Sequence, residues 1–303
     1  MKEFDKQLYD LLDANKIKRG EMMKNHTTFR IGGPADYFVM PESKEEIQSV
    51  LNLCKKEKVP FYIIGNGSNL LVSDEGFKGV ILQIGKGMDQ ISLEEDGKVR
   101  AFSGAMLSRL AQVIAEHELT GFEFASGIPG SLGGAVSMNA GAYGREIKDV
   151  IVEATVVDDH NEIKVLSKDE LKLSYRKSIV QTQGYVVIEA LFAFKPGKKE
   201  EILQKMNELN QKRREKQPLN FPSAGSTFKR PEGYFAGKLI EDAGLRGFRV
   251  GGAAVSNKHC GFIINEENAT AKDVRELIRQ VDMRVYEQFG VHLEPEIRMI
   301  GQF

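Results

Sequence analysis

Apolar side chains recur every three or four positions in six stretches of the chain, and this period predicts helices with one buried face. The predicted helices cover residues 3–15, the stretch opened by Ser43, 107–117, part of 195–216, 234–243 and the stretch from Thr270 to Gly290. Glu46 stands three residues after Ser43, and Asp273 stands three residues after Thr270. We therefore expect a capping box at the start of both helices, and Gly290 as the stop of the second.

Short apolar runs and alternating patterns predict the strands. The predicted strands lie before Pro41, at 61–64, 70–72, 80–84, 99–103, 150–158, 162–166, 185–194, 253–255 and 262–264, and from Leu293 onward. The three between 150 and 194 follow one another closely and predict an antiparallel sheet. Leu171, Leu173 and Tyr175 alternate with Lys172, Ser174 and Arg176, which predicts that Arg176 points away from the core.

Composition and charge narrow the class of protein. The 303 residues are 41% apolar and 28% charged, which is typical of a globular protein of two or three domains. A net charge of −1 gives no general attraction to nucleic acid or to a membrane. No apolar run is long enough to span a bilayer, and the charged start is unlike a signal peptide, so we expect a cytoplasmic protein without membrane insertion.

The two cysteines, Cys54 and Cys260, do not indicate a metal site. They are too far apart to form a CxxC motif, and an intracellular protein would keep them reduced. Cys54 falls on the apolar stripe of a predicted helix and is expected in the core. His259 beside Cys260 could be read as a metal pair, but two further ligands at suitable spacing are missing.

Two glycine-rich segments are the strongest candidates for a binding site. The stretch from Gly127 to Gly144 holds six glycines and no acidic residue, so its backbone N–H groups could face an anion such as a pyrophosphate. An ordinary glycine-rich loop is the alternative. The second segment, Gly65 to Asn69, follows a buried strand and precedes a second strand rather than a helix. This order disfavours a Rossmann fold.

The two segments together resemble a known class of flavoprotein. A strand ending in GNGSN, with GIPGSLGGAVSMNAGAYG about sixty residues later, resembles the FAD-binding domain of the vanillyl-alcohol-oxidase type, in which two small α+β halves clamp the flavin. From Asn25 to Gly301 the chain resembles the UDP-N-acetylenolpyruvoylglucosamine reductase family. The resemblance implies an α+β fold, with a FAD-binding domain at 1–200 (halves at about 23–88 and 89–200) that residues 291–303 rejoin, and a smaller substrate-binding domain at 201–290.

The resemblance also implies the ligands. FAD would be the cofactor, NADPH the hydride donor, and UDP-N-acetylglucosamine-enolpyruvate the substrate. Neither glycine-rich segment contains histidine or cysteine, so the FAD should be noncovalent. The residues implied in FAD binding are Gly65, Asn66, Gly67, Ser68, Asn69 and Leu70, then Gly130, Ser131, Gly133, Gly134, Ala135, Asn139, Gly141 and Ala142, and finally Arg298.

Three residues are implied in catalysis by their place in family motifs. Arg176 follows Ser-Tyr and would bind the substrate carboxylate, Ser226 in AGSTFKRP would be the proton donor, and Glu296 in LEPEIR would be catalytic. Burial could keep Glu296 protonated, so that it donates a hydrogen bond to the charge that builds up on the carboxylate. The ordinary alternatives are a surface arginine, a turn or capping serine, and a surface ion pair.

The substrate contacts are less well defined. Tyr175 and His259 are implied in substrate binding, and Lys216 and Arg230 are candidates for the phosphates. No insertion between Tyr185 and Lys195 corresponds to the tyrosine loop of longer reductases, so the chain resembles the shorter type. Two alternatives remain: an FAD oxidase of an alcohol or lactone on the same fold, and a nucleotide-binding protein without catalysis.

Overall fold

The computed structural model describes residues 2–303 and mixes helices with mainly antiparallel sheets, as the predicted α+β class requires. The helices are α1 (Lys2–Leu11), α2 (Lys44–Lys56), α3 (Leu107–Glu116), α4 (Leu132–Ser137), α5 (Ile179–Gln183), α6 (Lys199–Lys216), α7 (Ala236–Asp242) and α8 (Ala271–Phe289). The strands up to the middle of the chain are β1 (Ile17–Met22), β2 (Pro34–Val39), β3 (Phe61–Ile64), β4 (Leu70–Val72), β5 (Phe77–Gln83), β6 (Ile91–Leu93), β7 (Lys98–Phe102), β8 (Leu119–Thr120), β9 (Gly141–Ala142) and β10 (Arg145–Glu146). The later strands are β11 (Ile151–Val157), β12 (Ile163–Ser167), β13 (Val186–Ala193), β14 (Lys195–Pro196), β15 (Arg249–Val250), β16 (Ala253–Val255), β17 (Ile263–Asn265) and β18 (Arg298–Ile300).

The chain folds into two units, each built from separate segments. Unit 1 contains the segment ending at Lys18 together with Tyr37–Asn66 and Val80–Arg213, and unit 2 contains Arg19–Asp36, Gly67–Gly79 and Arg214–Phe303. Among residues 2–303, no helix has both the length and the apolar composition that crossing a bilayer requires.

The residues predicted to cap α2 and α8 from the sequence do cap these helices. Thr270 and Asp273 form the predicted reciprocal capping box of α8, and Gly290 ends this helix with a φ of 67°. Ser43 accepts a hydrogen bond from the Glu46 backbone N–H. The box at α2 is only half formed, however, because the Glu46 carboxylate accepts from the backbone of Glu42. The short helices α4 and α5 lie in stretches where no helix was predicted.

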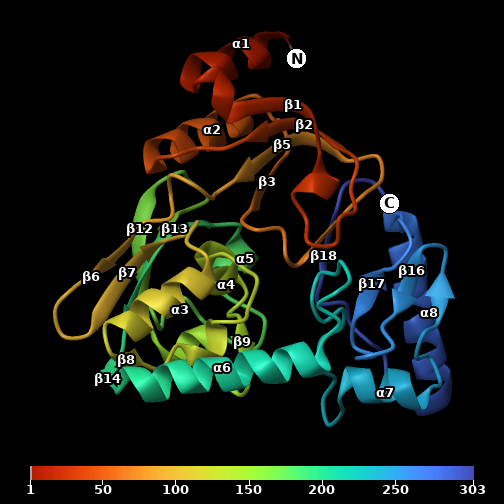
Figure 1. Ribbon diagram of the computed structural model, residues 1–303. Helices are drawn as coiled ribbons and strands as arrows, with labels where there is room; N and C mark the ends of the chain where they lie inside the picture. Colours follow the sequence, from red (N-terminus) through yellow and green to blue (C-terminus); the bar gives the residue numbers. More distant parts are fainter. Residues whose placement is uncertain (1) are drawn as a thin grey trace. The chain divides into compact units, whose positions relative to one another are not determined.

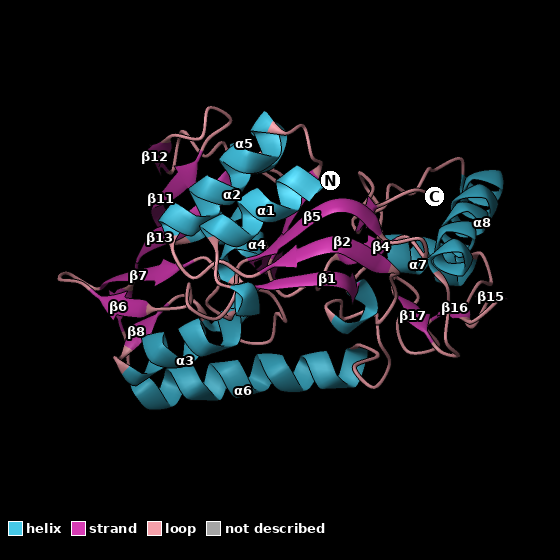
Figure 2. Ribbon diagram, turned by 90° about the horizontal axis from the view of Figure 1, so that it is seen from above, coloured by secondary structure: helices cyan, strands magenta, loops and turns pink. Residues whose placement is uncertain are grey.

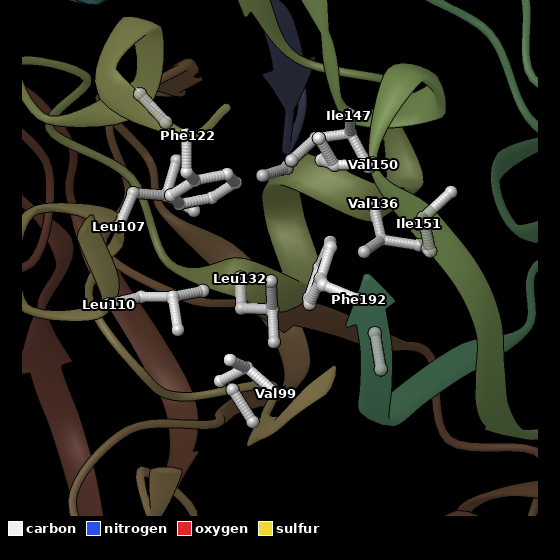
Figure 3. Close-up of a cluster of buried hydrophobic side chains, with 14 of the residues drawn as sticks. Val99, Leu107, Leu110, Phe122, Leu132, Val136, Ile147, Val150, Ile151 and Phe192 are labelled. Atoms are coloured by element: carbon white, nitrogen blue, oxygen red, sulfur yellow. The ribbon is translucent and has the colours of Figure 1, made fainter. Parts of the chain in front are cut away.

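Unit 1 is organised around a five-stranded antiparallel sheet with the order β12-β11-β13-β7-β6 (Figure 1). The three strands predicted between residues 150 and 194 are present, and β11 lies between the other two. A buried apolar cluster joins this sheet to α3, α4 and α6, with Phe122 near its centre against Phe124, Phe192 and Phe194. Figure 3 shows side chains of this cluster contributed by β7, α3, α4 and β13.

Helix α6 lies within the predicted range 195–216, and the part of it up to Arg213 belongs to unit 1. Ile202 and Met206 on one of its faces belong to the same buried cluster. Both views show α6 running alongside α3 (Figures 1 and 2). Most of the other side chains on the helix are polar or charged and exposed, so the predicted amphipathic pattern is confirmed.

A second sheet has the order β1-β2-β5-β3, with β3 and β5 parallel. Helices α1 and α2 cover it (Figure 2), and their apolar faces share one buried cluster with β2 and β5. Cys54 on α2 is fully buried in this cluster, and desolvation raises the pKa of its thiol to about 12. This agrees with the prediction that Cys54 is a core residue. Strand β1 lies where no strand was predicted.

In unit 2, helices α7 and α8 pack with the antiparallel sheet β15-β16-β17 (Figure 1). The last strand of the chain, β18, pairs in parallel with β4, so that Arg298 lies opposite Leu70. The strand predicted from Leu293 onward is therefore shorter than expected. Pro295, which has no N–H to donate, stands before β18, although Leu293 and Ile297 are buried and Glu294 and Arg298 exposed as the alternation predicted.

Candidate functional site

The two glycine-rich segments predicted to bind a cofactor meet in unit 1. A Cβ atom added to Gly65 would lie 1.9 Å from Ser131 Oγ, and the Asn66 side-chain amide donates to Pro129 O over 2.7 Å. Only glycine allows the backbone at residue 65 to come this close to the second segment. Two stretches far apart in the sequence thus form one surface of small polar groups.

Within the second segment, Gly133 is needed for packing, and the other small residues lie in regular elements. The Gly133 N–H donates to Ser103 O, and a Cβ at residue 133 would lie 2.9 Å from Ser103 Cβ. Gly133 is therefore explained by close packing, and its N–H is already used. Gly134 and Ala135 belong to α4, while Gly141 and Ala142 form β9, which pairs with β10.

Asn139 is fully buried and its side-chain amide is bonded within the chain. Its Nδ2 donates to Glu146 Oε2 and to Ser174 O, both over 2.9 Å, and its Oδ1 accepts from the Lys148 backbone N–H. Both amide hydrogens are thus used. This leaves the side chain without a donor for the flavin contact that the resemblance implied.

The second half of the GNGSN segment belongs to unit 2 and meets the C-terminal motif there. The Asn69 amide donates to Glu296 O over 3.1 Å, and the Arg298 N–H donates to Asn69 O over 2.9 Å. Leu70 then begins the pairing of β4 with β18. Gly67 and Leu70 are buried and Ser68 is half-buried, whereas the side chain of Arg298 is exposed.

Ser226 and Glu296 are brought together in unit 2 by backbone hydrogen bonds. The Glu296 N–H donates to Thr227 O over 2.7 Å, and Phe228 forms an antiparallel bridge with Pro295. Ser226 is exposed and Glu296 half-buried. The AGSTFK loop and the LEPEIR segment, which are far apart in the sequence, therefore lie side by side with both proposed catalytic residues on adjoining backbone.

Thr227 anchors this loop, and sequence reasoning passed over it. It is fully buried, its N–H donates to Gly261 O over 2.8 Å, and its hydroxyl accepts from the Ile263 N–H over 2.9 Å. Every hydrogen-bonding backbone group of Thr227 is engaged, so Ser226 beside it is presented from a fixed support. A threonine inside a motif chosen for its serine gives no sequence signal for this role.

The apolar and polar alternation at residues 171–176, from which the direction of Arg176 was predicted, does not correspond to an extended segment. Leu171 is buried, but the segment forms turns, and Ser174 and Lys177 close a tight turn by donating to each other's carbonyl oxygens over 3.0 and 3.1 Å. Arg176 is the third residue of this turn, with a φ of 55°. This left-handed conformation is unfavourable for a residue other than glycine.

The side chains at the tip of this turn contact one another. The Arg176 guanidinium lies 4.9 Å from the centre of the exposed Tyr175 ring, and its Nη2 donates to Gly141 O over 3.5 Å. Arg176 is half-buried rather than simply pointing away from the core. The strained turn therefore places an arginine and a tyrosine beside the second glycine-rich segment, all within unit 1.

The remaining predicted substrate residues lie in unit 2. Lys216 is exposed, and Arg230 stacks on the Phe235 ring at 3.9 Å. The His259 Nδ1 accepts from the Gly261 N–H over 3.1 Å, so the proton of the neutral ring sits on Nε2. Burial holds the pKa of His259 below its usual range, and the positive charges of Arg246 and Lys216 act in the same direction. At neutral pH the ring can therefore donate one hydrogen bond from Nε2 without carrying a charge.

The chemistry of these residues fits a nucleotide cofactor. Over residues 2–303, no three His, Cys, Asp or Glu side chains gather in a way that could hold a metal ion. The close approach at Gly65, together with Asn66 and Ser131, supplies small polar groups and backbone that a phosphate-bearing ligand can contact closely.

The fold and the paired glycine-rich segments place the chain in the class of α+β FAD-binding proteins, and a family model described as FAD binding domain matches residues 35–167. A second model, UDP-N-acetylenolpyruvoylglucosamine reductase, C-terminal domain, matches residues 217–300. The chain is 55% identical to a UDP-N-acetylenolpyruvoylglucosamine reductase from Lachnoclostridium phytofermentans, covering 98% of this chain and 96% of the relative. It is 53% identical to one from Caldanaerobacter subterraneus subsp. tengcongensis, covering 98% and 97%. The chain belongs to the UDP-N-acetylenolpyruvoylglucosamine reductase family.

Solved structures agree with this assignment. The crystal structure of the reductase from Thermus caldophilus matches with a TM-score of 0.80 at 36% identity, covering 94% of this chain and 99% of that one. Wild-type Phl p 4.0202, a glucose dehydrogenase, matches with a TM-score of 0.51 at 13% identity over 64% of this chain and 44% of that one. The second match shows a likeness of fold alone.

Proposed function

We propose that the protein reduces the enolpyruvyl group of UDP-N-acetylglucosamine-enolpyruvate to give UDP-N-acetylmuramate, a precursor of peptidoglycan, with NADPH as the reductant. The family supports this reaction, and one structural observation carries it on this chain. The Glu296 N–H to Thr227 O hydrogen bond holds the AGSTFK loop against the LEPEIR segment, so the proposed proton donor and the proposed acidic group are neighbours.

The cofactor we propose is noncovalent FAD, held by residues 65–70 and by the segment from Gly130 to Ala142, in which Asn139 contributes through its backbone alone. Arg298 contributes as well. When bound, FAD supplies the hydride for the terminal carbon of the enolpyruvyl double bond. The protein itself must then stabilise the negative charge that reaches the substrate carboxylate and must deliver one proton. These two tasks define the roles of the residues described above.

Arg176 suits the first task because a guanidinium can bind both carboxylate oxygens through charge-assisted hydrogen bonds. Glu296, if its carboxyl group carries a proton, donates a further hydrogen bond to the same charge. Ser226 then gives its Oγ proton to the carbon next to the carboxylate. The alkoxide left on Ser226 takes up a proton from water. A serine hydroxyl is a weak acid, so this transfer depends on the strong basicity of the intermediate and on fixed positions.

Substrate binding rests on Tyr175, Lys216, Arg230 and His259 in this proposal, with the two basic side chains assigned to the diphosphate. The proposed boundaries are 1–200 for the FAD-binding domain, rejoined by 291–303, and 201–290 for the substrate-binding domain. The pairing of β18 with β4 supports the return of the chain end to the flavin segment. We propose the cytoplasm as the site of action, in keeping with the two free cysteines.

The test measures the two half-reactions of the FAD-loaded protein separately, under anaerobic conditions. NADPH should reduce the wild type, and the enolpyruvyl sugar nucleotide should then reoxidise it. Ser226→Ala should be reduced normally, while its reoxidation should slow by roughly 10²–10⁴-fold, the usual contribution of general acid catalysis. Ser223→Ala, in the same loop, is the matched control and should behave as the wild type.

Two results would contradict the proposal at different levels. If the reduced wild type is not reoxidised by the enolpyruvyl sugar nucleotide, the proposed reaction is wrong. If Ser226→Ala is reoxidised at the wild-type rate, the reaction stands but Ser226 is not the acid. An alcohol or lactone that reduces the flavin directly would favour the oxidase alternative.

A further inference from the structure

The turn that carries Arg176 is held from both sides by the second glycine-rich segment. Ser174, at its start, accepts a hydrogen bond from the Asn139 amide over 2.9 Å. Ser178, just after its end, donates from its hydroxyl to Ser137 O. Both tethers lie within unit 1, and the Ser178 side chain is fully buried. The position of Arg176 therefore depends on Asn139 and Ser137, which hold the turn on either side of it.

Asn139 has the chemistry that this link needs. Lys148 offers it a donor, whereas the Glu146 carboxylate and the Ser174 carbonyl offer only acceptors. Only one orientation of the amide satisfies all three, with oxygen toward Lys148 and nitrogen toward the other two. Aspartate could not replace it, because it would put a carboxylate against two acceptors. The φ of 46° is one that asparagine tolerates better than most residues.

We infer that Asn139 is a positioning residue for Arg176, holding the Ser174–Lys177 turn on the glycine-rich segment so that the guanidinium stays in place for the substrate carboxylate. This inference rests on the proposed function, since it assigns a purpose to the placement of Arg176. It differs from a cofactor-binding role for Asn139, because the side chain acts on the substrate half of the reaction and not on FAD retention or on reduction by NADPH.

The variant Asn139→Gly removes the amide, and glycine adopts the same backbone conformation without strain. In anaerobic half-reactions the variant should retain FAD and be reduced by NADPH as the wild type is. Reoxidation by the enolpyruvyl sugar nucleotide should slow by about 10²-fold, the loss that a displacement of about 1 Å in a reacting complex can cause. Asn161→Gly is the matched control, because Asn161 is also left-handed at φ 66° and its amide donates to Gln48 O in unit 1. It should leave both half-reactions unchanged.

A double-mutant cycle decides whether Asn139 acts through Arg176. If it does, Asn139→Gly should cause little further loss in an Arg176→Ala background, because the positioned group is gone. Effects that multiply, or a loss of FAD or of NADPH reduction as large as the loss of reoxidation, would overturn the inference. If the wild type is active and Asn139→Gly behaves like Asn161→Gly, the inference is wrong as well. An inactive wild type would instead contradict the proposed function.

A variant that does not fold would not end the test. Ser178→Ala removes the second tether and leaves Asn139 in place, and it should show the same selective slowing of reoxidation. If Ser178→Ala instead impairs both half-reactions equally, or neither, the turn is not positioned by these tethers and the inference is wrong.

Discussion

The left-handed backbone at Arg176 allows a measurement that separates the cost of the turn from the value of its side chain. Of the ten residues other than glycine with a positive φ in residues 2–303, four lie at 139, 143, 172 and 176, within or near the two segments that carry the proposed FAD and carboxylate contacts. Strain of this kind persists where the surroundings over-determine the backbone, and it gathers at functional sites. Arg176→Gly and Arg176→Ala both remove the side chain, but only glycine relieves the strain.

The difference between the two variants can be worked out. A left-handed conformation costs a residue with a Cβ about 1–2 kcal/mol. Glycine loses about 0.5–1 kcal/mol more than alanine through its freer unfolded chain. Arg176→Gly should therefore be more stable than Arg176→Ala by up to about 1.5 kcal/mol, with a midpoint of about 0.8 kcal/mol. Every contact of the guanidinium is lost in both variants, so those contacts cancel in the comparison.

The assay is urea unfolding of both variants at one fixed FAD concentration, because ligand binding shifts apparent stability. Arg109 provides a control of opposite sign, since it is an exposed residue in the first turn of α3. There, Arg109→Gly should be less stable than Arg109→Ala, by less than the roughly 1 kcal/mol that glycine costs in a helix interior. If Arg176→Gly is also the less stable member of its pair, the turn is not strained at Arg176 and the reasoning fails. Both Arg176 variants should lose reoxidation by the substrate.

Three further predictions use other features. Acid precipitation should leave yellow flavin in the supernatant because the glycine-rich segments offer no histidine or cysteine tether; flavin in the pellet would contradict noncovalent binding. Gly65→Ala should weaken FAD retention, measured as flavin content, because the new methyl group would meet Ser131 Oγ; an unchanged content would show that the two segments can separate there freely. The ion pair with Lys164, with further backbone hydrogen bonds, lowers the pKa of Asp158 from 3.8 to about 2, so its stabilisation should be complete above pH 4 and lost as the pH falls toward 2. Urea unfolding in this range should show that loss in the wild type and a smaller one in Asp158→Asn.

The sequence predicted the elements whose signals are local. Both ends of helix α8 were predicted correctly, because the residues that cap it, Thr270, Asp273 and Gly290, act through hydrogen bonds within a few residues. At residues 171–176 the pattern misled because the outcome depends on a contact that is not local. Leu171 and Leu173 alternate with polar residues as a strand would, but Ile179 donates back to Leu171 O and the chain turns instead. Alternation cannot distinguish these outcomes, because both place apolar side chains toward the same core.

The site was predictable in its residues but not in its supports. Ser226, Glu296 and Arg176 were recognised from the motifs around them, whereas their chemistry alone would equally fit surface positions. Thr227 and Asn139, which hold these motifs in place, bond to segments far away in the chain. No spacing in a single sequence reports which distant carbonyl an amide will reach.

The parallel pairing of β18 with β4 has a consequence for how the protein is made. Strand β4 follows the GNGSN segment, and its partner is made much later, because Arg298 stands opposite Leu70. At roughly 5–20 residues per second, the early strand waits tens of seconds with an unpaired edge. Asn69 likewise cannot form its hydrogen bonds to Glu296 and Arg298 until those residues have been made. The flavin segment of a nascent chain is thus incomplete until β18 has been made, so cofactor capture should not precede the synthesis of β18.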